Sequence, residues 1–485
     1  MSPSRRSISL SRLSLVMLLL FVLLRCEAAN QKTPGRPLVF THVTVVDTSS
    51  GISRSDMTVQ INGTRISAVE QSRDASIPRR ATVIDGKGKF LIPGLWDMHV
   101  HTADAETFFP LFLANGVTGI RDMGMDLEKL KQWRREVEEG TRLGPRMVFS
   151  GPILDGPHTV VPDVARIVDT PVDGRRAVDD LKEQSVDFVK VYNFLPRNTY
   201  FAIADESEKV GLPFAGHVPL SISAVEASDA GQKSIEHLTG ILLACSTREA
   251  ALHREIWETI ELSKYSPLVV NRMLFSAPPV ELADTYSAEK ASQLFGRFVR
   301  NSTWQVPTLV VLRAIAYGNE QRFAARVKME YMRADIKASW SQARFGNRTP
   351  IEDRNVRQLF RMEQGVVGAM HRAGVKLLTG TDTPNPYVVP GFSLHEELVL
   401  LVEAGMTPMQ ALRTATYNPA QFLGLLDSLG AIKAGKEATL VLLDSDPIKD
   451  IHNVEKIDCI VLSGRLISKP ELTKMLEDEK RAAVQ

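Results

Sequence analysis

Cysteine is scarce in this chain, since its 485 residues include only Cys26, Cys245 and Cys459. These three are far apart in sequence, so their spacing fits neither a disulfide framework nor a zinc knuckle, and a hydrophobic core must hold the fold. A charge excess is also absent, because 58 Lys and Arg residues oppose 57 Asp and Glu residues. We therefore expect no nucleic-acid partner. Internal repeats and low-complexity segments are missing as well, which leaves an ordinary globular composition.

The apolar run at residues 13–24 is about 12 residues long, which is too short to span a bilayer comfortably but suits the core of a signal peptide. Arginines precede this run and small residues follow it. We predict that residues 1–28 are a signal peptide, of either the general secretory or the twin-arginine type. We also predict that the protein is secreted or periplasmic. Cleavage would leave no stable membrane insertion. The alternatives are an uncleaved membrane anchor and a lipidated Cys26.

Two segments at opposite ends of the chain have the short apolar runs and turn residues of β-strands. The predicted strands near the two ends are 39–46, 57–61, 65–69 and 81–84, and then 438–443, 459–462 and 465–467, with Asn62-Gly63 as a hairpin turn. A few strands are marginally stable alone, so we predict that residues 36–92 and 426–468 combine into one small β-sandwich domain. Residues 469–485 are predicted to be a C-terminal tail with a charged, solvated helix.

Residues 93–425 alternate short apolar strands with amphipathic helices. The predicted strands are 91–101, 116–121, 146–150, 188–192, 213–217, 233–237, 304–310 and 375–382. Eight βα units of this kind predict an α/β fold, a (β/α)8 TIM barrel. Two long connections, residues 239–301 and 313–373, leave room for extra helices over the catalytic face.

Side chains that can bind a metal end several of these strands. Alternation along a strand places His99 and His101 on the same side, where two imidazoles can bind one ion. His217, His237 and Asp382 end three further strands. Functional residues of a barrel lie at the carboxyl ends of its strands, so we expect one shared metal site. The alternative is a set of incidental histidines, with His217 as a hydrogen-bonded core residue.

Lys190 lies in the apolar segment 188–192, where a charged amine is out of place. The neutral amine can react with CO2 to give a carbamate, which is a long carboxylate able to bridge two cations. The alternative is that Lys190 forms an ion pair with a buried acid.

These motifs together resemble those of the amidohydrolase superfamily of metal-dependent hydrolases. The segment 93–101 is similar to the first-strand motif of that family, and the segments 394–420 and 424–441 are similar to its helices after the barrel and its return to the β domain. Within the superfamily, the chain is similar to the branch of imidazolonepropionase-like and prolidase-like proteins. The resemblance covers nearly everything after the predicted signal peptide.

The resemblance implies a role for each ligand candidate. His99, His101 and Asp382 would hold the more buried of two divalent ions, His217 and His237 would hold the more exposed ion, and carbamylated Lys190 would bridge them. Imidazole and carboxylate ligands favour Zn2+, with Mn2+, Co2+ or Fe2+ as alternatives. Asp382 is the predicted catalytic residue, because a carboxylate there can take a proton from water and pass it to the leaving amine.

Three further residues are predicted to assist. His158, in the loop after the third predicted strand, and Tyr192, at the end of the strand that contains Lys190, are expected to contact substrate. His395 is expected to orient the loop after Asp382. We predict an enzyme that hydrolyses C–N bonds of amides, cyclic amides or short peptides, with a dipeptidase as one option. The alternatives are an esterase, lactonase or phosphotriesterase on the same site, and a barrel that binds without turnover. The sequence is compatible with a homo-oligomer.

Overall fold

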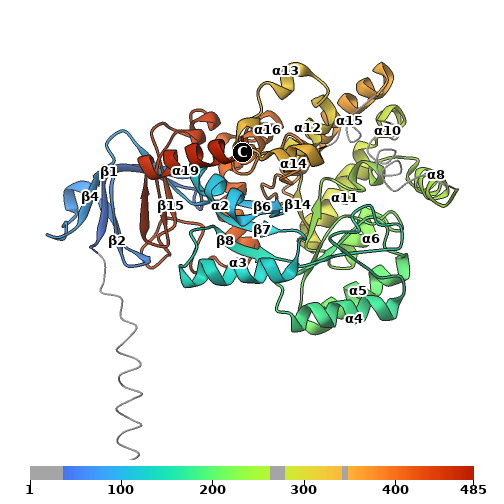
Figure 1. Cartoon of the computed structure of the whole chain (residues 1–485). Helices are drawn as coiled ribbons and strands as arrows, with labels where there is room; N and C mark the ends of the chain where they lie inside the picture. Colours follow the sequence, from blue (N-terminus) through green and yellow to red (C-terminus); the bar gives the residue numbers. More distant parts are fainter. Residues whose placement is uncertain (1–35, 263–278, 341–347, 485) are drawn as a thin grey trace, which may run out of the picture.

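The structure is a computed structural model that describes residues 36–262, 279–340 and 348–484. The predicted signal peptide, residues 1–28, lies outside these ranges. None of the described helices combines the length and the apolar composition that a membrane span requires. The described chain is an α/β protein, with one sheet at one end of the molecule and parallel strands with helices beside it (Figure 1).

Strands from both ends of the chain form one eight-stranded sheet, here called the terminal sheet. Its strands are β1 (Leu38–Asp47), β2 (Ile52–Asn62), β3 (Arg65–Gln71), β4 (Thr82–Asp85), β5 (Phe90–Pro93), β15 (Leu440–Leu443), β16 (Ile457–Leu462) and β17 (Arg465–Ser468). The two ends of the chain meet where Ile92 of β5 pairs with Val441 of β15. All eight strands are assigned to one sheet, so the two-sheet sandwich stays a prediction.

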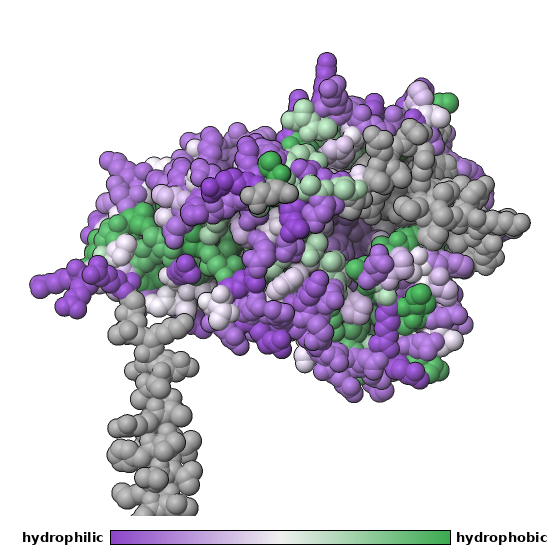
Figure 2. Space-filling view, in the orientation of Figure 1, coloured by the Kyte–Doolittle hydropathy of each residue, from purple (hydrophilic) through white to green (hydrophobic). Residues whose placement is uncertain are grey.

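The terminal sheet follows from apolar residues that alternate along its strands. Phe40, Val45, Leu91 and Leu440 belong to one buried cluster. The predicted hairpin between β2 and β3 is present, but its turn is shifted by one residue, because Asn62 still pairs with Arg65. Gly63 takes a left-handed φ of 58°, which glycine adopts at no steric cost. Figure 2 shows apolar side chains gathered over this end of an otherwise largely polar face.

The second assembly, here called the parallel-strand part, contains two sheets whose paired strands are all parallel. One has the order β6 (Leu95–Val100), β7 (Val117–Asp122) and β8 (Arg146–Phe149). The other has the order β10 (Ala165–Ile167), β9 (Ile153–Asp155), β11 (Val189–Val191), β12 (Phe214–Gly216), β13 (Ser234–Glu236) and β14 (Trp304–Val306). The short strands β9 and β10 were not predicted.

Backbone hydrogen bonds link these two sheets on both sides. The amide of Asp187 donates to the carbonyl of Phe149 at 3.0 Å, and the amide of Met98 donates to the carbonyl of Thr379 at 2.9 Å. Parallel bridges join Leu377 to Gln305 and Thr383 to Val100. The segment 377–383 therefore lies between β14 and β6.

The prediction of a regular strand over residues 375–382 is wrong, because this segment makes only isolated bridges. The amides of Thr381 and Asp382 both donate to the carbonyl of His99, at 3.2 and 2.7 Å. Asp382 also has a left-handed φ of 64°. These two features break the regular ladder at the residue that carries a candidate ligand.

The prediction of one continuous strand over residues 91–101 is also wrong. Gly94 separates β5, in the terminal sheet, from β6, in the parallel-strand part. A Cβ atom at Gly94 would collide with the side chain of Thr118, so only glycine fits where the chain passes between the two assemblies. The step from one sheet to the other thus occurs five residues before His99.

Helices cover the parallel-strand part (Figure 1). They are α2 (Ala105–Ala114), α3 (Leu127–Glu139), α4 (Pro171–Glu183), α5 (Arg197–Val210), α6 (Ala224–Asp229), α11 (Ala288–Asn301), α12 (Leu309–Tyr317), α15 (Pro350–Arg372), α16 (Phe392–Glu403), α17 (Pro408–Thr414) and α18 (Tyr417–Phe422). The long connections add further helices, as predicted: α7 (Ile241–Ala244), α8 (Glu249–Leu262), α10 (Pro279–Thr285), α13 (Gln321–Ala324) and α14 (Ala334–Ser339).

The C-terminal helix α19 (Lys469–Ala482) is present as predicted, but it is not simply a solvated tail. It packs against α2 and against β16 and β17, and its Leu472 is buried. Cys245 and Cys459 are both buried and free, as expected of small apolar side chains.

Candidate functional site

The candidate ligands gather at the carboxyl ends of the parallel strands, a region here called the carboxyl face. His99 is in β6 and Lys190 in β11, whereas His217 and His237 directly follow β12 and β13. Asp382 lies in the segment between β14 and β6. Parallel strands end on the same side of a sheet, so five separate stretches of sequence deliver these side chains to one place.

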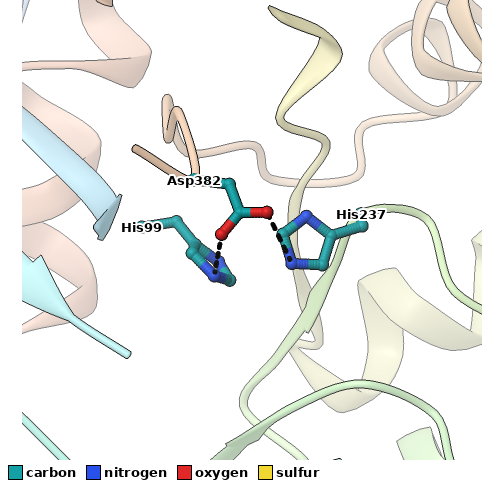
Figure 3. Close-up of side chains that lie close together, drawn as sticks. All are labelled: His99, His237 and Asp382. Carbon is teal, nitrogen blue, oxygen red and sulfur yellow. Dashed lines mark ion pairs between the residues drawn. The ribbon is translucent and has the colours of Figure 1, made fainter. Parts of the chain in front are cut away.

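Three of the candidates lie close enough to share one ion. One ligand atom from each of His99, His237 and Asp382 lies within 4.8 Å of the other two (Figure 3). The Oδ1 atom of Asp382 is 3.4 Å from Nε2 of His99, and its Oδ2 atom is 3.9 Å from Nε2 of His237. His101 joins the group, with its Nε2 atom 3.3 Å from Oδ1 of Asp382. The carboxylate of Asp382 is therefore central to the cluster.

His217 and Lys190 complete the set on the other side of His237. The rings of His217 and His237 have centroids 4.9 Å apart. Tyr192 tilts against the ring of His217 at 4.1 Å, and the Nζ atom of Lys190 lies 5.9 Å from the Tyr192 centroid. The predicted ligands thus form a continuous group.

Each of the four histidines is oriented by a hydrogen bond at its Nδ1 atom. The partners of His99, His101, His217 and His237 are, in order, Glu236 Oε2 at 2.8 Å, the Gly124 carbonyl at 2.9 Å, Asn193 Oδ1 at 2.7 Å and Thr308 Oγ1 at 2.6 Å. An imidazole that donates from Nδ1 keeps the lone pair of Nε2 for a metal. The oxygen partners of His99, His101 and His217 accept, which holds those three rings in the state that a metal site requires, and the hydroxyl of Thr308 can accept from His237 in the same way.

The remaining atoms fit a divalent cation. Within the described ranges, Nε2 of His99, Nε2 of His217 and Nζ of Lys190 are buried without a hydrogen-bond partner. Buried polar atoms are normally satisfied, so three such atoms in one cluster indicate a missing ligand. Burial lowers the pKa of His237 to about 4 and that of Lys190 to about 8. Neutral imidazoles with a carboxylate are the ligands that zinc and related ions take.

Asp382 carries the negative charge of the cluster. Burial alone would raise the pKa of its carboxyl group, but the facing His237 and His101 lower it below the usual value. The carboxylate is therefore ionised at neutral pH, although only 15% of its side chain is exposed. Such a group can both bind a cation and accept a proton.

The backbone is strained around these residues. His237, Leu238, Thr308 and Asp382 have φ angles of 55°, 56°, 47° and 64°, in the left-handed region that non-glycine residues seldom adopt. Such conformations persist only where the surroundings enforce them, and they concentrate at functional sites. Here they occur at two candidate ligands, at the residue after one of them and at the hydrogen-bond partner of His237.

Two acids hold the loops around the cluster. Asp97 accepts from the hydroxyl of Thr381 at 2.7 Å and from the amide of Thr381 at 3.0 Å, next to Asp382. Burial raises the pKa of Asp97 to about 7. Asp122 accepts from the amides of Thr102 and Gly124 at 2.6 and 3.0 Å. These bonds fix the backbone on both sides of His101.

The predicted substrate residues lie farther out. His158 is exposed in the loop after β9 and lines a cavity of 740 Å³, together with Phe194, Leu220 and Arg254. Tyr192 is partly exposed and lies against His217. His395 has a different contact from the one expected, since its Nε2 atom bonds with the carbonyl of Asn115 at 2.9 Å rather than with the loop after Asp382.

Sequence reasoning missed the partners of the histidines. Asn193, Glu236 and Thr308 each bond to a ring nitrogen, and Arg121 is buried against Glu236. One signal was available, because an acid directly before His237 and an arginine inside an apolar strand are both out of place in a core. Which histidine these two residues support depends on the folded structure and cannot be read from the sequence.

Comparisons with known proteins found similarity to hydrolases of one family. A model of the Amidohydrolase family matches residues 355–467. Imidazolonepropionase from Shouchella clausii is 28% identical over 124 residues, which are 24% of this chain and 27% of that protein. Ochratoxinase from Aspergillus niger is 32% identical over 114 residues, 22% of this chain and 23% of that protein. The chain spans about a quarter of the length of the curated relatives that it matches.

Solved structures resemble the chain over most of its length. Bottromycin amidohydrolase has a TM-score of 0.73 at 23% identity, covering 94% of this chain and 92% of that one. A Xaa-Pro dipeptidase with methionine bound in its active site has a TM-score of 0.64 at 20% identity, covering 89% of this chain and all of that one. At these identities the likeness shows the fold alone.

The family match at residues 355–467 and the curated relatives support a relation of this chain to the amidohydrolase superfamily. This agrees with the prediction from its motifs, which placed the chain near the imidazolonepropionase-like and prolidase-like proteins.

Proposed function

We propose that this protein is a metal-dependent hydrolase that cleaves C–N bonds in small amides, cyclic amides or short peptides. The observation that carries the proposal is the set of four histidines bonded at Nδ1, three of which, His99, His101 and His237, have Nε2 within 3.9 Å of the carboxylate of Asp382. The relatives named as imidazolonepropionase, ochratoxinase and Xaa-Pro dipeptidase support this class of reaction. The two parallel sheets and the segment between them would together form the (β/α)8 barrel of this superfamily.

Two ions are the expected cofactors. His99, His101 and Asp382 would hold one ion, and His217 with His237 would hold the second. Their ligand types suit Zn2+, with Mn2+, Co2+ or Fe2+ as alternatives. Lys190 would bridge them as a carbamate, which forms when its neutral amine adds to CO2 and releases a proton. The pKa of about 8 at Lys190 supports this step, because a substantial fraction of the amine is neutral near that pH.

Bound divalent ions would supply a lowered pKa for water and polarisation of the substrate carbonyl. The protein's own contribution is proton transfer and orientation. The carboxylate of Asp382 would take the proton of the attacking water and give it to the leaving nitrogen, because it is ionised and lies at the centre of the cluster. The hydrogen bonds at Nδ1 would hold the four rings still during this exchange.

The substrate would enter from the carboxyl face. The 740 Å³ cavity lined by His158 and Phe194 lies over the loops that follow β9 and β11, and its size suits a small molecule or a short peptide. Phe194 directly follows Asn193, the partner of His217, so the cavity and the cluster share one loop. His158 and Tyr192 are the residues that we expect to contact substrate.

Secretion through a cleaved signal peptide at residues 1–28 is part of the same proposal. The intact mass of the protein recovered from its native compartment tests it, since cleavage removes the segment and lipidation of Cys26 adds the mass of acyl chains. An uncleaved mass in a membrane fraction would instead support the anchor.

The proposed function is tested by metal content and turnover in one preparation. Two divalent ions per chain, with the added mass of one CO2 in a native spectrum, would support the bridged site. Hydrolysis of dipeptides or N-acyl amino acids that stops on chelation and returns with Zn2+ would support the reaction. Turnover only of esters, lactones or phosphotriesters would favour that alternative, and binding without turnover of any of these compounds would overturn an enzymatic role.

A further inference from the structure

His99 has a partner unlike those of the other three histidines. Its Nδ1 atom bonds to the carboxylate of Glu236 at 2.8 Å, and both side chains are fully buried. His101, His217 and His237 bond at Nδ1 to neutral oxygen atoms of a backbone carbonyl, an amide side chain and a hydroxyl group. A negative charge therefore lies behind one ring of the four.

Glu236 is fixed in turn by a buried arginine. The Nη2 atom of Arg121 donates to both carboxylate oxygens of Glu236, at 2.9 and 3.1 Å. Its Nε atom donates to the carbonyl of Met98 at 2.7 Å, next to His99, and its Nη1 atom donates to the hydroxyl of Ser234 at 3.0 Å. Only 1% of the Arg121 side chain is exposed. The guanidinium thus ties β13 to β6 at the level of the candidate ligand.

We propose that Glu236, held by Arg121, is a positioning residue that strengthens one of the two metal positions, the one at His99, His101 and Asp382. This inference rests on the proposed function, because it concerns the affinity of that site for its ions. It adds an order of binding, in which the position backed by the carboxylate fills first and empties last.

The physical reason is the effect of an anionic acceptor on imidazole. A carboxylate on Nδ1–H fixes the tautomer, restrains the ring and makes Nε2 a stronger electron donor to a cation. A neutral amide oxygen, such as that of Asn193 behind His217, also fixes the tautomer and restrains the ring, but it adds little to the basicity of Nε2. Loss of such a partner changes metal affinity by about 10- to 100-fold. On loss of Glu236 we expect that change at the His99 position and not at the His217 position.

The strand β13 makes the arrangement possible. Glu236 ends the strand and points to His99, whereas His237 follows it with a left-handed φ of 55° and points to Asp382. Two adjacent residues therefore serve the two sides of the cluster. Adjacent residues of a regular strand point to opposite faces, so the left-handed φ at His237 marks the departure from the strand that lets both side chains reach the cluster.

The test compares Glu236→Gln with Asn193→Ala, its counterpart behind His217. Because Glu236→Gln leaves the Arg121 charge without its anion, the double variant Arg121→Met with Glu236→Gln removes both charges and guards against misfolding. Each protein is loaded with Zn2+ and dialysed against a graded series of chelator concentrations. Bound zinc is counted per chain, and loading with Co2+ gives the absorption spectrum of each position separately.

We expect wild type to lose its two ions in two steps, with the tighter step weakened about 10- to 100-fold in Glu236→Gln and in the double variant. Asn193→Ala should weaken the other step instead. Equal weakening of both steps in Glu236→Gln, or an unchanged tighter step in the double variant, would overturn the inference while leaving the proposed hydrolase intact. A wild-type chain that binds no divalent ion would overturn both.

Discussion

The terminal sheet and the carboxyl face are built from opposite kinds of buried side chain. The core of the terminal sheet is apolar, with Phe40 and Val45 fully buried. The carboxyl face buries Lys190, Glu236 and Arg121 instead, all at 1% exposure or less. Burial of an apolar group is favourable by itself, whereas burial of a charge is unfavourable until a partner or a ligand compensates it.

The difference teaches where stability and function reside in this molecule. Apolar side chains of the terminal sheet stabilise the fold because they are buried away from water. Their loss should lower the free energy of unfolding and leave the candidate metal ligands unchanged. Side chains of the carboxyl face hold one another in an arrangement that the proposed cations would complete. Their loss should change metal binding or turnover more than it changes stability.

The largest effect is expected at Asp382. Asp382→Asn keeps the size of the side chain but removes the charge and the proton acceptor, so turnover should fall by roughly 10²- to 10⁴-fold. Circular dichroism and the thermal midpoint should remain close to those of wild type. Steady-state kinetics on the best amide substrate measure the loss. A variant with near-normal kcat would show that the carboxylate does no chemistry.

The matching substitution in the terminal sheet is Phe40→Ala. Phe40 in β1 is fully buried, so the variant should lose about 3–5 kcal/mol of unfolding free energy. Its kcat per folded molecule should stay at the wild-type value. Urea denaturation gives the first quantity and active-site titration with kinetics the second. Val83→Ala on neighbouring β4, where the side chain is 49% exposed, is the control and should change stability by less than about 0.5 kcal/mol. A large drop in kcat for Phe40→Ala would show that the terminal sheet contributes to turnover as well as to stability.

Sequence patterns predicted most strands of the terminal sheet and the positions of the candidate ligands along the chain, because both depend on local order. Alternation along β1 and the spacing of His99 and His101 follow from residues that are adjacent in the chain. The histidines and Lys190 lie at or beside the ends of parallel strands in the structure, and Asp382 lies in the irregular segment between β14 and β6.

The partners behind the histidines were not predictable in this way. Glu236 is 137 residues from His99, and Thr308 is 71 residues from His237. Nothing local to either histidine encodes which acceptor it meets, because the pairing depends on how the strands are ordered. The irregular backbone at Asp382 was missed for a similar reason. Its amide bonds to the carbonyl of His99 on β6 rather than continuing a ladder.

A smaller effect, dependent on pH, is expected at Glu397 on α16. Its carboxylate accepts from the amide of Val310 at 2.7 Å, and burial raises its pKa to about 8. The unfolded chain releases this proton near pH 4, so the folded state loses relative stability as the pH rises from about 5 to 8. Glu397→Gln cannot titrate and should avoid this loss, which is on the order of 2 kcal/mol. Denaturation of both proteins at the two pH values measures it, and parallel curves would contradict the assignment.

The smallest effect is expected where a long insertion touches the carboxyl face. The indole Nε1 of Trp340 donates to the carbonyl of Pro384 at 2.8 Å, two residues after Asp382, and its ring lies 6.3 Å from that of Tyr387. Trp340→Phe keeps an aromatic ring but removes the donor, a net loss of about 1 kcal/mol. If this bond helps to hold the loop, kcat/KM should fall severalfold while the zinc content stays constant.

The control for Trp340 is Trp133→Phe on α3, where the ring packs against Phe109 away from the loop after Asp382. This variant should leave kcat/KM unchanged. Equal kinetics for the two variants would show that the insertion merely covers the carboxyl face. A selective loss in Trp340→Phe would extend the functional region beyond the strand ends, because a residue from a connecting segment would then act on the geometry of Asp382.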